Sequence, residues 1–200
     1  MDEEEFFIYH SAPVETIPKI LREGLTPGSE TYRREMEADL EATANRKSIS
    51  LPVTRQECVF CYPSLRQAME MATFDTGPPG SREPLFPRSG LLAVDTRTIR
   101  DELYVADFDF FSDVIDLRVM DEPDHAVRSD SYEAALTNYA DSVTSLHAFD
   151  SPAEIDDTFR IPEVLIEADI SPASIRETIL RKEICGTGWF SSYPGLPAGE

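Results

Sequence analysis

The chain has 200 residues, of which 41% are hydrophobic, and its formal net charge is −20 at pH 7. This apolar content is sufficient for one domain with a core, and no apolar run is long enough for a transmembrane helix. The acidic N-terminus differs from a secretory signal. We therefore expect a cytoplasmic protein without membrane partners.

The acidic residues are dispersed along the chain, and lysine occurs only at Lys19, Lys47 and Lys182. An acidic surface over an ordinary core is typical of proteins from a high-salt, haloarchaeal-like cytoplasm, where carboxylates keep the protein hydrated. A nucleic-acid mimic and a disordered acidic protein are the alternatives. Blocks of like charge or a low apolar content would favour them, and the sequence has neither, so we favour salt adaptation.

The first predicted strand is the aromatic and branched run at residues 6–9, which ends at His10. We expect Ser11 to cap a following helix that Gly24 closes. His10 would then lie beside the free N–H groups of a helix N-terminus, which suits an anionic or sugar-bearing ligand. A capped helix with an incidental histidine is the alternative interpretation.

Charged and alanine-rich residues at 30–47 predict a solvated helix, with the acidic residues 35–41 on its solvent-facing side. Residues 58–62 predict a second strand, and residues 65–73 a helix. Cys58 and Cys61 would point to opposite faces of that strand, and neither a second cysteine pair nor a nearby histidine accompanies them. Buried thiols are therefore favoured over a zinc site, and no metal ion is expected.

The rest of the chain predicts more strands than helices. The expected strands are 90–95, 104–111, 114–119 and 160–166, with 179–184 as a last strand or turn; helical turns are expected at 98–103 and 172–176, a helix at 131–146, and loops at 75–89, 120–129 and 150–157. This pattern predicts an α+β fold rather than a regular βαβ alternation. We expect one domain over residues 1–185 and a flexible tail over 186–200.

Three pieces of the sequence, in this order, resemble the ADP-ribosyltransferase fold over most of residues 6–184. They are Tyr9-His10-Ser11-Ala12 followed by the I-x-x-I-L-x-x-G-L pattern of residues 17–25, the strand and helix of residues 58–68, and Pro162-Glu163-Val164-Leu165-Ile166 followed by Ile-x-Pro. The opening is similar to that of RNA 2′-phosphotransferases, poly(ADP-ribose) polymerases and DarT-type DNA ADP-ribosyltransferases. The phrase around Glu163 is most similar to the DarT-type enzymes. This resemblance implies a split, mostly antiparallel β-sheet with flanking helices.

The resemblance also implies an NAD-dependent ADP-ribosyltransferase that modifies a nucleic acid base or another macromolecule, as a toxin or defence protein. An antitoxin or an ADP-ribosylglycohydrolase would be its partner. Glu163 would be the catalytic carboxylate, because breaking the bond between nicotinamide and ribose creates an oxocarbenium-like positive charge that a fixed carboxylate stabilises. His10 would bind the adenosine ribose and face the same cleft as Glu163.

The resemblance implies further contacts with NAD, the co-substrate. The backbone of Ser11 would hold the nicotinamide amide, and Tyr62 would also contact NAD. In DarT-type enzymes an arginine before the second strand contacts NAD. Arg46 and Arg55 compete for that role, and we favour Arg46.

The sequence departs from the family pattern at two places. Ala12 replaces a frequent hydroxyl residue, and residues 69–71 lack the tyrosine of the polymerases, which argues against chain elongation. Glu163 argues against the RNA 2′-phosphotransferases, which use an arginine-rich set instead. A catalytically silent module that binds a nucleotide or a protein is the main alternative, and a DNA-mimicking interaction protein is a third.

Overall fold

The computed structural model describes residues 7–28, 31–73, 89–99, 102–119 and 125–180, and within them the strands form two sheets. Strands β1 (Phe7–Pro13), β3 (Ser89–Asp95) and β7 (Ile175–Leu180) form one sheet in the order β1-β3-β7; β2 (Val59–Cys61), β6 (Pro162–Ile166), β4 (Tyr104–Asp107) and β5 (Thr144–Ser145) form the other in the order β2-β6-β4-β5. Every neighbouring pair is antiparallel. The predicted α+β class is therefore confirmed.

The edge strands β1 and β2 meet at one point and so join the two sheets. The backbone of Tyr9 donates to the carbonyl of Tyr62 at 2.9 Å, and the backbone of Tyr62 donates to the carbonyl of Tyr9 at 2.7 Å. A second isolated bridge connects Leu25 to Ile170. The sheets are thus fastened by short local contacts rather than by a continuous ladder, and β1 and β2 lie at the junction.

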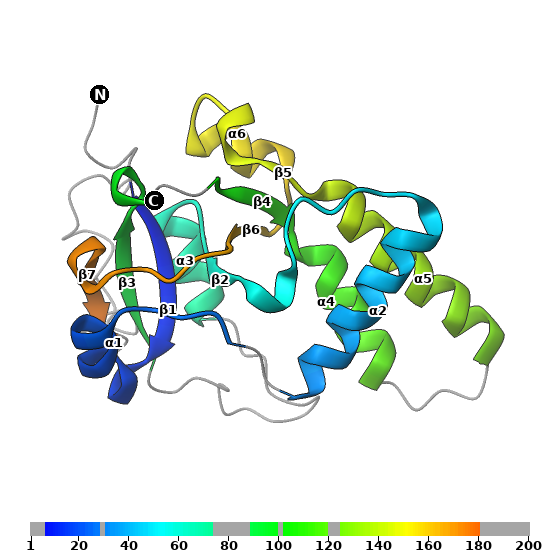
Figure 1. Ribbon diagram of the computed structural model, residues 1–200, viewed down its shortest axis with the longest axis horizontal. Coiled ribbons are helices and arrows are strands. Elements are labelled where there is room, and N and C mark those ends of the chain that lie inside the picture. Colours follow the sequence, from blue (N-terminus) through cyan, green and yellow to red (C-terminus); the bar gives the residue numbers. More distant parts are fainter. Residues whose placement is uncertain (1–6, 29–30, 74–88, 100–101, 120–124, 181–200) are drawn as a thin grey trace, which may run out of the picture.

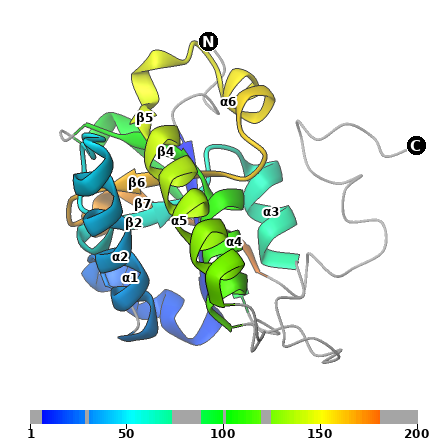
Figure 2. The same ribbon diagram turned by 90° about the vertical axis from the view of Figure 1, so that its right-hand side faces the viewer.

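Three of the helices gather on one side of the β2-β6-β4-β5 sheet. The α-helices are α1 (Ile17–Glu23), α2 (Thr31–Lys47), α3 (Leu65–Thr73), α4 (Phe108–Val119), α5 (His125–Ser142) and α6 (Pro152–Thr158), and the short 3-10 turns are η2 (Val14–Thr16), η3 (Arg55–Glu57), η4 (Thr96–Thr98), η5 (Leu146–Ala148) and η6 (Pro172–Ser174). Figure 1 shows α2, α4 and α5 together at the right-hand end, and Figure 2 views them from that end. Within the described ranges, no helix combines the length and apolar character that crossing a membrane requires.

Alternation along the strands divides the core into clusters on opposite faces. On one face, Val164 and Ile166 of β6 pack with Ile8 and Ala12 of β1. On the other face, Leu165 packs with residues of α2, α4 and α5, among them Leu40, Phe111 and Leu136. The helices α2, α4 and α5 therefore cover the face toward which β6 directs Glu163 and Leu165.

Several predicted elements are confirmed. The strands expected at 58–62 and 90–95 are β2 and β3, the strand expected at 160–166 is β6, and the helix expected at 65–73 is α3. Gly24 closes α1 with a φ of 91°. Of the loop expected at 75–89, residues 75–88 lie outside the described residues, and residue 89 begins β3. The tail expected at 186–200 also lies outside the described residues.

Other predicted elements are wrong because capped helices begin where the apolar pattern predicts strands or loops. Residues 108–111 and 114–119 form part of α4 rather than strands, because Asp107 ends β4 and its carboxylate accepts from the backbone N–H of Asp109 at 3.1 Å. Residues 152–157 belong to α6 rather than to a loop, because Ser151 caps that helix and Pro152 occupies its first turn. Similarly, α5 begins at His125 inside the expected loop and ends before 146.

The first strand and the first helix also differ from the prediction. Strand β1 continues past His10 because the segment from Ser11 to Pro13 pairs with β3. Helix α1 begins only at Ile17, with Thr16 as its N-cap. His10 and Ser11 therefore lie inside a β-ladder, not at a helix N-terminus, and the expected anion site there is absent. Between 98 and 103, the described part holds only the end of η4 and extended residues.

Candidate functional site

Arg55 is the centre of a buried polar cluster on the helical face of the sheet. It lies in η3, between α2 and β2, and is 4% exposed. Its guanidinium carbon is 4.3 Å from the ring centroid of Phe60 and 3.9 Å from that of Phe111. Burial alone would lower the pKa of Arg55, but the charge of Glu163 and the Tyr139 hydroxyl outweigh burial and raise it. The guanidinium therefore stays charged in an apolar setting.

Glu163 is the main anionic partner of Arg55. Nη2 of Arg55 donates to both carboxylate oxygens of Glu163, at 3.1 and 3.0 Å, across 108 sequence positions. The Tyr139 hydroxyl donates to Oε1 of Glu163 at 2.6 Å and accepts from Nε of Arg55 at 3.0 Å. Burial, followed by the Glu163 charge, raises the pKa of Tyr139 well above its usual value, so its phenol remains a neutral donor.

Glu37 supplies a second carboxylate, which the sequence prediction placed in solvent. Nη1 of Arg55 donates to Oε1 of Glu37 at 3.0 Å, and the Glu37 side chain is 0% exposed. The prediction of a solvated acidic face at 35–41 is therefore wrong at this position. Met36, Leu40 and Ala44 form a buried stripe beside Glu37. Their four-residue spacing is the sequence pattern that indicates a buried face on this helix.

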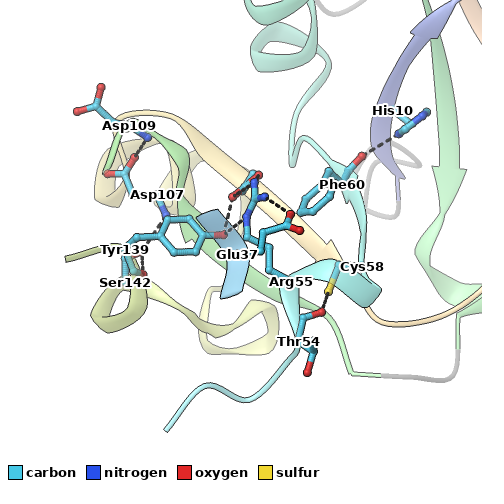
Figure 3. Close-up of polar contacts among 11 residues, drawn as sticks. His10, Glu37, Thr54, Arg55, Cys58, Phe60, Asp107, Asp109, Tyr139 and Ser142 are labelled. Atoms are coloured by element: carbon cyan, nitrogen blue, oxygen red, sulfur yellow. Dashed lines mark hydrogen bonds and ion pairs between the residues drawn. The ribbon is translucent and has the colours of Figure 1, made fainter. Parts of the chain in front are cut away.

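We call Glu37, Arg55, Glu163 and Tyr139 the Arg55 cluster (Figure 3). It places two carboxylates against one guanidinium in a buried space. Burying charges costs several kcal/mol per ion unless their partners compensate. Such clusters occur at functional sites and also in structural ion-pair networks. The Arg55 cluster is therefore both the structural tie between helices and sheet and the candidate site.

His10 contacts the opposite side of β2. Its Nδ1 is 2.8 Å from the carbonyl oxygen of Phe60, and because a carbonyl only accepts, Nδ1 carries the proton and Nε2 presents a lone pair. Burial lowers the pKa of His10, while the hydrogen bond to Phe60 opposes this shift. Figure 3 shows Phe60 between His10 and Arg55.

His10 and Glu163 are linked indirectly, through Phe60 and Arg55, and their sharing of one cleft stays a prediction. His10 lies on the same face of β1 as Ile8 and Ala12, which pack with Val164, whereas Glu163 points to the helices. Among the described residues, the two side chains share no hydrogen bond, and Phe60 connects their surroundings through its carbonyl and its ring.

The other predicted site residues lie apart from the Arg55 cluster. Arg46 is at the end of α2 with a side chain that is 56% exposed, 3.5 Å from Glu133. Ser11 pairs with Leu91 in the β1-β3 ladder. Tyr62 forms the bridge to Tyr9, and its ring packs beside α3. Of the two arginines considered, Arg55 rather than Arg46 contacts the predicted catalytic glutamate.

The described cysteines are free thiols in separate clusters. Cys58 packs with the helices and Cys61 on the opposite face of the sheet. Burial, as the largest cause, raises the pKa of Cys58 to about 12 and also raises that of Cys61. Among the described residues, no three His, Cys, Asp or Glu side chains gather as a metal site would require.

Comparisons with protein-family models, with curated proteins and with solved structures find no significant match.

Proposed function

We propose that the chain is an NAD-dependent ADP-ribosyltransferase that uses Glu163 as its charge-stabilising carboxylate and Arg55 as its anion-binding partner. The contact between Arg55 and Glu163 carries this proposal. In the DarT-type enzymes that the sequence resembles, an arginine before the second strand and a glutamate in the Pro-Glu-Val-Leu-Ile phrase both belong to the NAD site. A contact across 108 positions cannot follow from local sequence preference.

The fold supports the proposal in two respects. Two antiparallel sheets that meet at one bridge agree with the split, mostly antiparallel sheet of the family. Glu163 lies on β6, which has β2 and β4 on either side, so the backbone beneath the carboxylate is rigid. A rigid, preorganised carboxylate is what stabilisation of a developing positive charge requires.

The guanidinium of Arg55 and the carboxylate of Glu163 are chemically suited to bind NAD. A guanidinium binds phosphate oxygens in a planar fork, and a carboxylate stabilises positive charge on a ribose. Neither side chain is accessible to a ligand in this conformation, because Arg55 and Glu163 are 4% and 6% exposed and both Glu163 oxygens accept from Arg55. The conformation described here is therefore closed to NAD.

The acceptor and partners follow from the resemblance alone. We propose a nucleic acid base or another macromolecule as acceptor, and an antitoxin or an ADP-ribosylglycohydrolase as the partner that limits or reverses the modification. The net charge of −20 opposes general attraction to phosphates at low salt. At about 1 M salt, where the Debye length is about 3 Å, that charge acts only locally.

The test measures nicotinamide released from NAD, and transfer of labelled ADP-ribose to DNA, RNA and protein, in molar salt. Glu163→Gln keeps the shape of the side chain and removes its charge, so we expect transfer to fall by about 100-fold or more while NAD still binds. Glu177→Gln changes an exposed carboxylate on β7 and is the matched control. Equal activity of wild type and Glu163→Gln, or no NAD binding and no turnover by the wild type, overturns the proposal.

A catalytically silent module is the second candidate. Two observations favour it: Glu163 is almost fully buried, and the hydrogen bond of His10 is to the Phe60 carbonyl rather than to a member of the Arg55 cluster. In that case the Arg55 cluster only ties the helices to the sheet. An NAD-dependent rise in melting temperature without nicotinamide release identifies this function.

A further inference from the structure

Side chains from four elements close the space around Glu163, so any ligand that reaches this carboxylate requires one of them to move. They are Glu37 of α2, Arg55 of η3, Phe111 of α4 and Tyr139 of α5. Phe111 and Tyr139 are both 0% exposed, and their ring centroids are 5.2 Å apart. Helices α4 and α5 are thus fixed to each other through the core beneath the site.

Helix α2 is held to the other helices by exposed ion pairs, by a bond from the Tyr132 hydroxyl to Asp39 and by a buried apolar stripe. From α4, Arg118 donates to Glu35 at 2.5 Å and to Asp39 at 2.9 Å, and from α5, Glu133 pairs with Lys47 at 3.0 Å. Exposed pairs contribute little to stability, and salt screens them. The apolar stripe of Met36, Leu40 and Ala44 is the remaining attachment. Helix α2 therefore packs on the site through one buried stripe, while its ion pairs with α4 and α5 are exposed.

Glu37 occupies a position on Arg55 that an anionic ligand would use. Its carboxylate accepts from Nη1, on the side of the guanidinium away from the Nη2 that binds Glu163. A phosphate oxygen binds guanidinium N–H groups in the same way as a carboxylate oxygen. If Arg55 binds the diphosphate of NAD, as in the proposed function, the Glu37 carboxylate occupies an N–H group that the diphosphate would use.

We propose that α2 autoinhibits the site, with Glu37 as a displaceable internal competitor for Arg55. In the closed state, Glu37 occupies Nη1 of Arg55 and α2 covers Glu163. In the open state, α2 leaves, the diphosphate of NAD replaces the Glu37 carboxylate, and Glu163 becomes accessible. This inference rests on the proposed function and names the regulation of the same site.

The charge balance of the cluster favours a removable Glu37. With both carboxylates bound, one guanidinium faces two negative charges. Replacing Glu37 with glutamine leaves one carboxylate opposite one guanidinium and keeps an amide oxygen as acceptor for Nη1. We therefore expect Glu37→Gln to fold, and its melting temperature and circular dichroism verify this before activity is compared.

The decisive experiment compares Glu37→Gln with Glu41→Gln, which changes a partly exposed glutamate one turn further along α2. Nicotinamide release from NAD and deuterium uptake by the amides of residues 34–47 are measured on the same full-length samples. We expect Glu37→Gln to raise NAD turnover roughly 10-fold, within the usual range of coupling between sites, and to speed exchange in α2. Glu41→Gln should change neither.

A second variant tests α2 without altering the cluster. Arg118→Gln removes the exposed contacts of α4 to Glu35 and Asp39 of α2, together with a hydrogen bond to the Tyr132 hydroxyl of α5. Arg160→Gln, which breaks an exposed pair with Asp109 at the other end of α4, is its control. We expect Arg118→Gln to raise both turnover and exchange, and Arg160→Gln to raise neither.

The outcomes separate this inference from the proposed function. If the wild type hydrolyses NAD but Glu37→Gln and Arg118→Gln change neither rate nor exchange, autoinhibition is wrong and the enzyme assignment stands. If both variants speed exchange in α2 but no variant binds or hydrolyses NAD, the proposed function fails, and autoinhibition of an NAD site fails with it.

Discussion

The hydroxyl of Tyr139 lies 2.6 Å from Oε1 of Glu163 and accepts from Nε of Arg55 at 3.0 Å, so one phenol connects both charges of the ion pair. Because the phenol is a donor to Glu163 and an acceptor from Arg55, its hydrogen position is determined. The three residues come from α5, β6 and η3. Any displacement of α5 along the sheet therefore breaks charged hydrogen bonds.

Loss of Arg55 should destabilise the fold severely. Arg55→Gln leaves Glu37 and Glu163 buried without their guanidinium, and breaking a buried pair from one side costs about 3–5 kcal/mol. Urea unfolding at pH 7 measures the loss. Arg46→Gln is the control, because its side chain is 56% exposed and its pair with Glu133 is worth about 1 kcal/mol or less. Similar losses in both variants would show that the Arg55 cluster is not a stabilising centre.

The two tyrosine hydroxyls of α5 should differ in their contribution to stability. Tyr139→Phe removes a buried donor to Glu163 and a buried acceptor for Arg55, which costs about 1–3 kcal/mol. Tyr132→Phe removes a bond to Asp39 at 2.8 Å near the surface, where water replaces it, so we expect a loss below about 1 kcal/mol. Thermal unfolding of both variants compares them on one helix, and a larger loss for Tyr132→Phe would contradict this account.

The sequence predicted the strands of the core well because their burial is recorded in local apolar runs. The sequence of β2 is apolar throughout, and the structure buries all five residues of β6 and the first and last residues of β2. The helices α4 and α6 were missed because their caps, Asp107 and Ser151, depend on single hydrogen bonds at element boundaries. Branched residues at 114, 115 and 119 resemble a strand until the helical cap is recognised.

The partners within the Arg55 cluster could not be derived from the sequence in the same way. The sequence predicts Glu163 as the carboxylate but does not decide between Arg46 and Arg55, because nothing local distinguishes a buried arginine from an exposed one. Glu37 lies among charged residues that predict a solvated face, and its buried carboxylate contacts Arg55, 18 positions further along the chain. The contacts of Arg55 with Glu37, Tyr139 and Glu163 span 18, 84 and 108 sequence positions, so tertiary packing decides them.

His10 should make stability depend on pH near neutrality. Because burial lowers its folded pKa below 6.5, the unfolded chain binds more protons than the folded protein as pH falls through 6.5. The wild type therefore loses stability on acidification, with a slope of at most about 1.4 kcal/mol per pH unit from this group.

His10→Asn keeps an N–H donor for the Phe60 carbonyl and cannot titrate, so the difference in unfolding free energy between the two proteins should shrink or reverse toward acid pH. His147→Asn, at an exposed position in η5, should keep the slope of the wild type; equal slopes in all three would place the effect elsewhere.

Gly24, which ends α1, should not tolerate replacement by a residue with a side chain. Its φ of +91° is costly for residues with a Cβ, and a Cβ there would lie 2.3 Å from the carbonyl oxygen of Ile170. That oxygen accepts from the backbone of Leu25 at 3.0 Å, so it cannot withdraw without breaking the bridge. We expect Gly24→Ala to lower the free energy of unfolding, measured in urea, by at least about 1–3 kcal/mol.

Gly28→Ala is the control. A Cβ there meets nothing within 4 Å, so the free energy of unfolding should change by less than about 1 kcal/mol in either direction. Equal behaviour of the two variants would mean that the turn after α1 adapts and that the Leu25–Ile170 bridge is not rigid.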